Sequence, residues 1–167
     1  MENINMAEFG LLNQYAAFAE EYKREYIVGR ILSQEKGLYR LISEKGEQSA
    51  VASGKLRYNA KSASDFPAVG DFVLIDCNNM QGHAVIHNIL PRKSVFIRKA
   101  AGTAHTEQIV AANIDTVFIC MSLNNDFNIR RLERYLSVAW DSGATPPMVC
   151  VMMIKADIQR QGVNYFC

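Results

Sequence analysis

Residues 26–43, YIVGRILSQEKGLYRLIS, decide how the chain begins to fold. Two runs rich in Ile, Leu, Val and Tyr flank the tetrapeptide QEKG at 34–37. Apolar, β-branched runs on either side of a short Gly-containing turn are typical of a β-hairpin. The sequence therefore predicts strands at 26–33 and 37–43, joined by a tight turn.

The same pattern of short, strand-like apolar runs separated by turns continues to residue 98. A second turn, EKGE, leads into a run at 47–58, and a loop with Pro67 follows it. Further runs stand at 71–77, 83–90 and 94–98. Five or six short, closely spaced strands favour a small β-barrel, and about seventy residues is the size of a five-stranded OB-fold. Folds of this class often bind nucleic acid.

The segment before the predicted barrel has a different period. Residues 8–25, EFGLLNQYAAFAEEYKRE, space their apolar positions at helical intervals, so that Leu11, Leu12, Tyr15 and Phe18 can share one face. We predict an N-terminal helix that packs on the following strands.

The segment after the predicted barrel is of α/β type. Residues 114–121 form a near-continuous apolar run, as expected for a strand buried on both faces. A helix is predicted at 129–141, with Asn128 as its N-cap and Gly143 at its end. A second buried strand is expected at 148–154. This βαβ unit is too small to make a complete doubly wound sheet.

Positive charge gathers in the predicted barrel. Residues 26–105 carry eleven bases and six acids (11 − 6 = +5), whereas residues 1–25 and 106–167 sum to −3 (2 − 5) and −1 (5 − 6). This asymmetry predicts a polyanionic partner for the middle segment. The RNA-binding candidates are Arg40, Lys55, Arg57, Arg92, Lys93, Arg98 and Lys99, with Arg30 and Lys61 as further phosphate contacts. Tyr39, Tyr58 and Phe96 are candidates for stacking on bases.

Several classes of protein are disfavoured by composition. No run approaches eighteen apolar residues, and the acidic start MENINMAEFG does not resemble a secretory signal. The four cysteines form no CxxC pair, and His83 and His87 have no third ligand nearby in the sequence. We therefore expect reduced thiols, with Cys120 and Cys150 buried, a cytoplasmic location and no metal site.

The stretch IKAD at 154–157 follows the last predicted strand, where open α/β sheets bind their ligands. It has the shape of the guanine-reading motif Asn/Thr-Lys-x-Asp. Asp157 could accept both guanine N1–H and the exocyclic amine, and the stem of Lys155 could lie over the base. The sequence contains no GxxxxGK[ST] phosphate loop, so no GTP hydrolysis is expected of the chain alone.

Four blocks together resemble the RsgA (YjeQ) family of small-ribosomal-subunit-dependent GTPases. They are DFPAVGDFV at 65–73, AVIHNILPRKSVFIRKAAG at 84–102, AANIDTVFICMSLNNDFNIRRLERYLSVAWDSGA at 111–144 and IKADI at 154–158. The resemblance implies an OB-fold, then a circularly permuted GTPase domain in which the base-reading motif precedes the phosphate loop, then a zinc-binding domain. Position 154 is Ile where the family usually has Asn or Thr, and this difference weakens the expected guanine contact.

The resemblance also implies a function and a division of the chain. We expect an N-terminal helix at 1–25, an OB-fold domain at 26–100 and a truncated part of the GTPase domain at 106–167. Relatives couple late maturation of the 30S subunit to GTP hydrolysis, so 16S rRNA is the expected partner, and GTP or GDP belongs to the family. Tight nucleotide binding and zinc are not expected here, and the tail QRQGVNYFC departs from the family's continuation.

Two other functions stay open from the sequence. The chain could be a stand-alone OB-fold module that binds RNA, with an α/β remnant that serves folding or self-association through its open sheet edges. It could instead be a GTPase that takes its phosphate loop from another chain.

Overall fold

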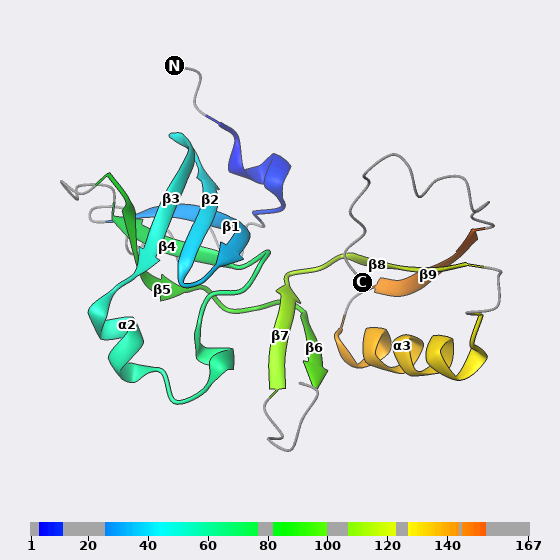
Figure 1. The fold of residues 1–167 in the computed structure, drawn as a ribbon. Helices are drawn as coiled ribbons and strands as arrows, with labels where there is room; N and C mark the ends of the chain where they lie inside the picture. Colours follow the sequence, from blue (N-terminus) through cyan, green and yellow to red (C-terminus); the bar gives the residue numbers. More distant parts are fainter. Residues whose placement is uncertain are drawn as a thin grey trace, which may run out of the picture. The chain divides into compact units, whose positions relative to one another are not determined.

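The computed structural model describes residues 4–11, 26–76, 82–99, 107–122, 127–143 and 145–152 (Figure 1). The chain divides into two compact units, with the division between Ile114 and Asp115. Each unit is described by itself below.

The first unit contains a closed five-stranded barrel. Its strands are β1 (Ile27–Glu35), β2 (Leu38–Ser43), β3 (Gly46–Ala52), β4 (Phe72–Asp76) and β5 (Ala84–Ile89). They follow one another around the barrel in the order β1-β2-β3-β5-β4, and β4 pairs with β1 to close it. All neighbours are antiparallel except β3 and β5, which are parallel. The predicted OB-fold barrel is confirmed.

The barrel interior is filled by alternate residues of its strands. Tyr39 and Leu41 of β2 point inward with Ile31, and they meet Val73, Ile75 and Ile86 from β4 and β5. A second apolar cluster lies outside this interior, where Phe72, Leu74 and Leu90 pack with Met6. Alternation of inward and outward side chains is what a half-exposed antiparallel strand requires, and it matches the alternation in the sequence.

The hairpin between β1 and β2 turns through Lys36 and Gly37. Both residues have positive φ, 46° and 84°, which suits a two-residue turn whose twist matches the strands. Glu35 and Leu38 pair directly across this turn. The turn predicted from QEKG is therefore confirmed.

One predicted strand is two elements. The run at 47–58 was expected to be a single strand, but β3 ends at Ala52 and a short helix, α2 (Gly54–Asn59), begins two residues later. Ser53 causes the change, because its side chain caps the helix by accepting a hydrogen bond from Leu56 N–H. A single 3₁₀ turn, η2 (Ala63–Asp65), follows in the connection to β4.

A separate antiparallel pair follows the barrel in the same unit. It consists of β6 (Val95–Lys99), at the position of the predicted run 94–98, and β7 (Glu107–Ala112), which the sequence did not indicate. Ala112 N–H donates to Val69 O at 2.8 Å, and Asn113 N–H donates to Ser94 O at 2.8 Å. The end of β7 is thereby tied to the loop before β4 and to the start of β6.

The second unit is a βαβ arrangement. Strands β8 (Thr116–Ser122) and β9 (Thr145–Met152) are parallel, and α3 (Ile129–Asp141) connects them. The helix has the predicted bounds, and Asn128 caps it by accepting from Arg131 N–H at 3.1 Å. The second strand begins earlier than predicted, since Pro146 and Pro147 belong to its first residues.

The expectation that the first of these strands is buried on both faces is wrong. In β8, Ile119 and Met121 are buried, but Phe118 is 61% exposed and Cys120 is exposed as a free thiol. Among the described elements, α3 packs against this pair of strands, and one helix covers one face of a sheet. The predicted burial of Cys120 is wrong for the same reason.

Little of the predicted N-terminal helix can be compared with the structure. Residues 12–25 of the range 8–25 lie outside the described residues. The part before them forms a 3₁₀ turn, η1 (Met6–Phe9), which is capped by Asn5 and ends at Gly10 with φ 81°. In the described part of the chain, no helix is long and apolar enough to cross a membrane.

Candidate nucleic-acid interface

The helix α2 is held on the barrel by one capped end and one apolar side chain. Ser53 N–H donates to Ile86 O at 2.9 Å, and its hydroxyl accepts from Leu56 N–H at 3.1 Å. Leu56 packs against the barrel interior. Because Leu56 faces inward, its neighbours on the six-residue helix must face outward.

Three predicted contacts and one predicted stacking residue are exposed on α2 or just after it. Lys55 and Arg57 of α2 are exposed, Lys61 is exposed just after the helix, and Tyr58 has 90% of its surface accessible. We call Lys55, Arg57, Tyr58 and Lys61 the α2 patch. Its composition, three exposed cations and an uncovered aromatic ring close together in the sequence, is what non-specific binding of single-stranded RNA uses.

The connection after α2 is fixed by Asp65. Its Oδ2 accepts from Lys61 N–H at 2.8 Å, from Ser62 N–H at 2.9 Å and from the Ser62 hydroxyl at 3.1 Å. These hydrogen bonds, that from Lys61 N–H first, lower the pKa of Asp65 below its ordinary value of 3.8. The carboxylate holds the backbone next to Lys61 while the lysine side chain stays exposed.

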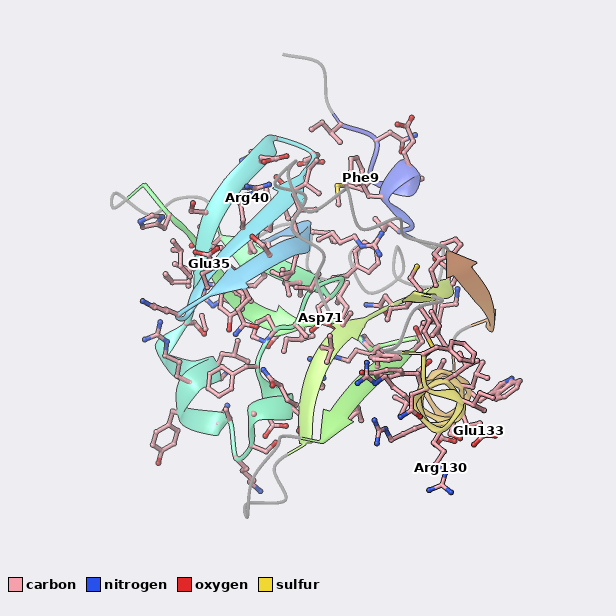
Figure 2. All side chains as sticks on the ribbon, turned by 45° about the vertical axis from the view of Figure 1, so that its right-hand side comes forward. Phe9, Glu35, Arg40, Asp71, Arg130 and Glu133 are labelled. Atoms are coloured by element: carbon pink, nitrogen blue, oxygen red, sulfur yellow. The ribbon has the colours of Figure 1, made fainter. Side chains whose placement is uncertain are left out.

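Arg40 lies on the outer surface of the barrel, as Figure 2 shows, and it has an exposed partner. Its Nε lies 3.5 Å from Glu47 Oε2 across β2 and β3, and both side chains are more than half exposed. An exposed pair of this kind contributes little to stability and can exchange partners at small cost. Arg40 therefore remains available to a phosphate group.

Arg92 is used inside the protein. Its Nε and Nη2 donate to the two carboxylate oxygens of Asp71 at 2.8 and 2.7 Å, while Nη1 donates to Ser64 O at 2.8 Å. Nη2 also donates to Phe66 O at 2.9 Å. The guanidinium is thus occupied on all three nitrogens, and its geometry favours a structural role over the predicted phosphate contact.

The other predicted cations are distributed differently. Lys93 is exposed beside Arg92, whereas Arg98 and Lys99 lie on β6 with side chains outside the described set. Arg30 is half-buried: its guanidinium lies 5.3 Å from the ring centre of Phe72 and donates to the backbone oxygens of Phe9 and Asn113. Lys155 and Asp157, the predicted guanine contacts, also lie outside the described residues.

The three candidate stacking residues also separate. Tyr39 is only 2% exposed and belongs to the barrel interior, so the hypothesis that it stacks on bases is wrong. Burial raises the pKa of the Tyr39 hydroxyl above its ordinary value of 10.0. Phe96 is partly buried, and Tyr58 is the candidate with an uncovered ring.

Sequence reasoning missed the residue that anchors this region. Asp71 is fully buried, accepts from Ala68 N–H at 2.8 Å and binds Arg92. The sequence did contain a signal, namely a carboxylate directly after Gly70 at the start of an apolar strand. Such a carboxylate is expected to be buried and therefore to need a cationic partner. Among the described residues, no group of three His, Cys, Asp or Glu side chains could hold a metal ion.

Comparison with known proteins identifies similar sequences. The sequence model of the RsgA GTPase family matches residues 89–164. The small ribosomal subunit biogenesis GTPase RsgA 2 of Lactiplantibacillus plantarum is 46% identical over 155 residues, which are 93% of this chain and 42% of that protein. RsgA 1 of Listeria innocua is 43% identical over 146 residues, 86% of this chain and 39% of that protein. The chain thus spans about two fifths of the length of these curated relatives.

The fold is similar to that of two solved structures. The crystal structure of YjeQ from Thermotoga maritima matches 81% of this chain and 44% of its own, with a TM-score of 0.54 and 19% identity. The structure of YloQ, described as a circularly permuted GTPase, has a TM-score of 0.54 and 20% identity to this chain. The match covers 81% of this chain and 43% of the YloQ chain. At this identity the likeness concerns the fold alone.

Proposed function

This chain is related to the N-terminal part of the RsgA family, and from that relation we propose that it binds the small ribosomal subunit through ribosomal RNA. The barrel, residues 26–100, is the proposed RNA-binding domain. Residues 1–25 are the proposed helical extension, and residues 106–167 are the proposed part of a GTPase domain.

One observation carries the proposal, namely the composition of the α2 patch. Tyr58 is 90% exposed on a helix whose other exposed side chains include Lys55 and Arg57. Stacking of an exposed aromatic ring on a nucleobase contributes favourable binding free energy, and so does each contact between a cation and a phosphate group. The same helix is fixed to the barrel by Ser53 and Leu56, so the patch is presented on a rigid support.

RNA binding by full-length variants tests this proposal. We expect Lys55→Gln/Arg57→Gln/Lys61→Gln to weaken binding of an RNA oligonucleotide and to lower the salt slope of log K by about 2, near 0.7 per lost phosphate contact. Tyr58→Ala should weaken binding with little change in that slope. Lys45→Gln, in the turn at the other end of β3, removes one exposed lysine and serves as the control. Equal affinities for all variants would contradict the proposal.

The second part of the proposal concerns guanine. We propose that Lys155 and Asp157 contribute to guanine recognition in longer relatives, where GTP hydrolysis accompanies late maturation of the small subunit. The sequence match at 89–164 includes both residues, which supports this assignment. Because this sequence contains no phosphate loop and has Ile154, we propose that the chain alone neither binds GTP tightly nor hydrolyses it. Equilibrium binding of a fluorescent GDP analogue tests this, and submicromolar affinity would contradict it.

A second candidate function is that of a separate RNA-binding module which self-associates. The exposed side of β8, with Phe118 at 61% and Cys120, favours this alternative. Phe118→Ser should then lower the mass measured by light scattering at high protein concentration. A monomeric mass at all concentrations would remove this candidate. Both candidates imply a protein of the cytoplasm, where ribosomal RNA is found.

A further inference from the structure

The helix α3 presents three arginines to solvent. Ala139 is buried and Leu132 and Leu136 are half-buried on the side of α3 that packs against β8 and β9. Arg130, Arg131 and Arg134 are exposed, and Figure 2 shows Arg130 directed away from the helix. Positions 130 and 134 are one helical turn apart and therefore share a face.

These arginines have no acidic partner among the described residues. Among the described residues, the α3 arginines form no ion pair, whereas Arg40 and Arg92 of the first unit pair with Glu47 and Asp71. Glu133 lies three positions after Arg130, a spacing that commonly allows pairing, but no ion pair joins the two side chains. Within the described structure, pairing with acidic side chains therefore does not account for these arginines.

The position of the arginines opposes the stability of the helix. The first turn of α3 contains no acidic residue and instead carries Arg130 and Arg131, although the positive end of the helix dipole favours carboxylates there. Arg130 and Arg134 also repel each other across one turn. The last turn, where cations would be favourable, has none. Residues that destabilise the helix or strand to which they belong are expected at functional sites.

We propose that the arginine face of α3, defined by Arg130, Arg131 and Arg134, binds the phosphodiester backbone of RNA as a contact surface additional to the barrel. The guanidinium group binds phosphate through two parallel hydrogen bonds and is weakly hydrated, which suits this role better than lysine. The inference rests on the proposed function, because RNA is the polyanion that the barrel is proposed to bind. A phosphate backbone also explains why cations gather at the helix end that least tolerates them.

The chain contains its own reporter for this surface. Trp140 is the single tryptophan of the sequence, lies on α3 and is 62% exposed. We expect an RNA that extends along α3 from the arginines to change the surroundings of this indole, which stands near the C-terminal end of the helix. Fluorescence of the unmodified chain therefore gives a reading of α3 that requires no substitution.

Salt-dependent RNA binding by the full chain tests the proposal. The probe is an RNA oligonucleotide longer than the ~16 nucleotides that one OB-fold can occupy. We expect Arg130→Gln/Arg131→Gln/Arg134→Gln to weaken binding and to lower the salt slope by about 2. Its melting temperature should not fall, because the change removes unfavourable charges from the first turn. Arg134→Gln and Lys45→Gln each remove one positive charge, and only the first should weaken binding measurably.

Glu133→Gln provides a test with the opposite sign. Removal of this carboxylate from the arginine face should tighten RNA binding by several-fold, an outcome that loss of folding cannot imitate. Unchanged affinity in both the triple arginine variant and Glu133→Gln, with no change of Trp140 fluorescence on RNA addition, would overturn the inference. If the α3 variants behave in this way but the α2 patch variants lose RNA binding in the same assay, the proposed function stands and only this inference falls. Binding of a polyglutamate peptide instead of RNA by α3 would also overturn it.

Discussion

Arg92 and Asp71, which stand after β5 and just before β4, form a bidentate ion pair with Nε–Oδ1 and Nη2–Oδ2 distances of 2.8 and 2.7 Å. The Asp71 side chain is fully buried and the Arg92 side chain is 17% exposed. Asp71 also accepts from Ala68 N–H, and Arg92 donates to Ser64 O and Phe66 O. The pair thus holds residues 64–71 of the connection between α2 and β4.

Removal of Arg92 should destabilise the protein strongly. Arg92→Ala leaves a buried carboxylate without its cation and frees two carbonyl groups, so we expect a loss of about 3–5 kcal/mol in the free energy of unfolding. Arg92→Lys should recover little of it, because an ammonium group cannot form the two parallel bonds. Urea unfolding measures both effects.

Arg40→Ala is the matched control for this prediction. Arg40 also pairs with a carboxylate, but at 3.5 Å and with both side chains more than half exposed. We expect a cost below about 1 kcal/mol. Equal costs at Arg92 and Arg40 would show that the pair with Asp71 has no special structural role.

Gly70→Ala should be among the most damaging small substitutions. Gly70 has φ +87°, and a Cβ atom there would stand 2.1 Å from Ala112 O, a backbone atom that cannot rotate away. Strain of the backbone and displacement of β7 together predict a cost of about 3 kcal/mol or more.

Gly37→Ala separates these two causes. Gly37 has a similar φ of +84°, but nothing lies within 4 Å of the added Cβ. Only the backbone strain remains, about 1–2 kcal/mol. Thermal unfolding of both variants checks the difference, and equal costs would mean that the contact with Ala112 is easily relieved.

The stability contributed by Asp65 should depend on pH. Because hydrogen bonds lower the pKa of Asp65 in the folded protein, its contribution is fully present above the unfolded value near 3.8 and disappears as pH falls through the lower folded pKa. The difference in stability between the wild type and Asp65→Asn should therefore be constant at neutral pH and shrink only below about pH 4. An NMR titration of the carboxyl group with a midpoint at or above 3.8 would contradict this account.

The barrel could be predicted from the sequence because its information is local. Alternating apolar residues and Gly-containing turns mark each strand, and the Lys36–Gly37 turn fixes the first hairpin. The helix α3 could be predicted equally well, since Asn128 and Gly143 mark its two ends. In contrast, α2 was predicted as part of a strand, because a segment of six residues is too short for a helical period to be recognised in its sequence.

The candidate site could be predicted only in part, because exposure and pairing are tertiary properties. Sequence treats Arg57 and Arg92 alike, yet one lies open on α2 and the other is enclosed by Asp71 and two carbonyl groups. Tyr39 and Tyr58 are likewise equal as residue types, and only the fold separates a core ring from an uncovered one. Pairing of β6 with β7 also depends on contacts far apart in the sequence.

Co-sedimentation with purified 30S subunits, with 50S subunits as the control and across a salt series, tests the central claim most directly. We predict that the chain sediments with 30S and not with 50S, that binding weakens as salt increases, and that the α2 patch variant Lys55→Gln/Arg57→Gln/Lys61→Gln sediments less than Lys45→Gln. Absence of the wild-type chain from the 30S pellet at low salt, or equal binding to both subunits, would contradict the account.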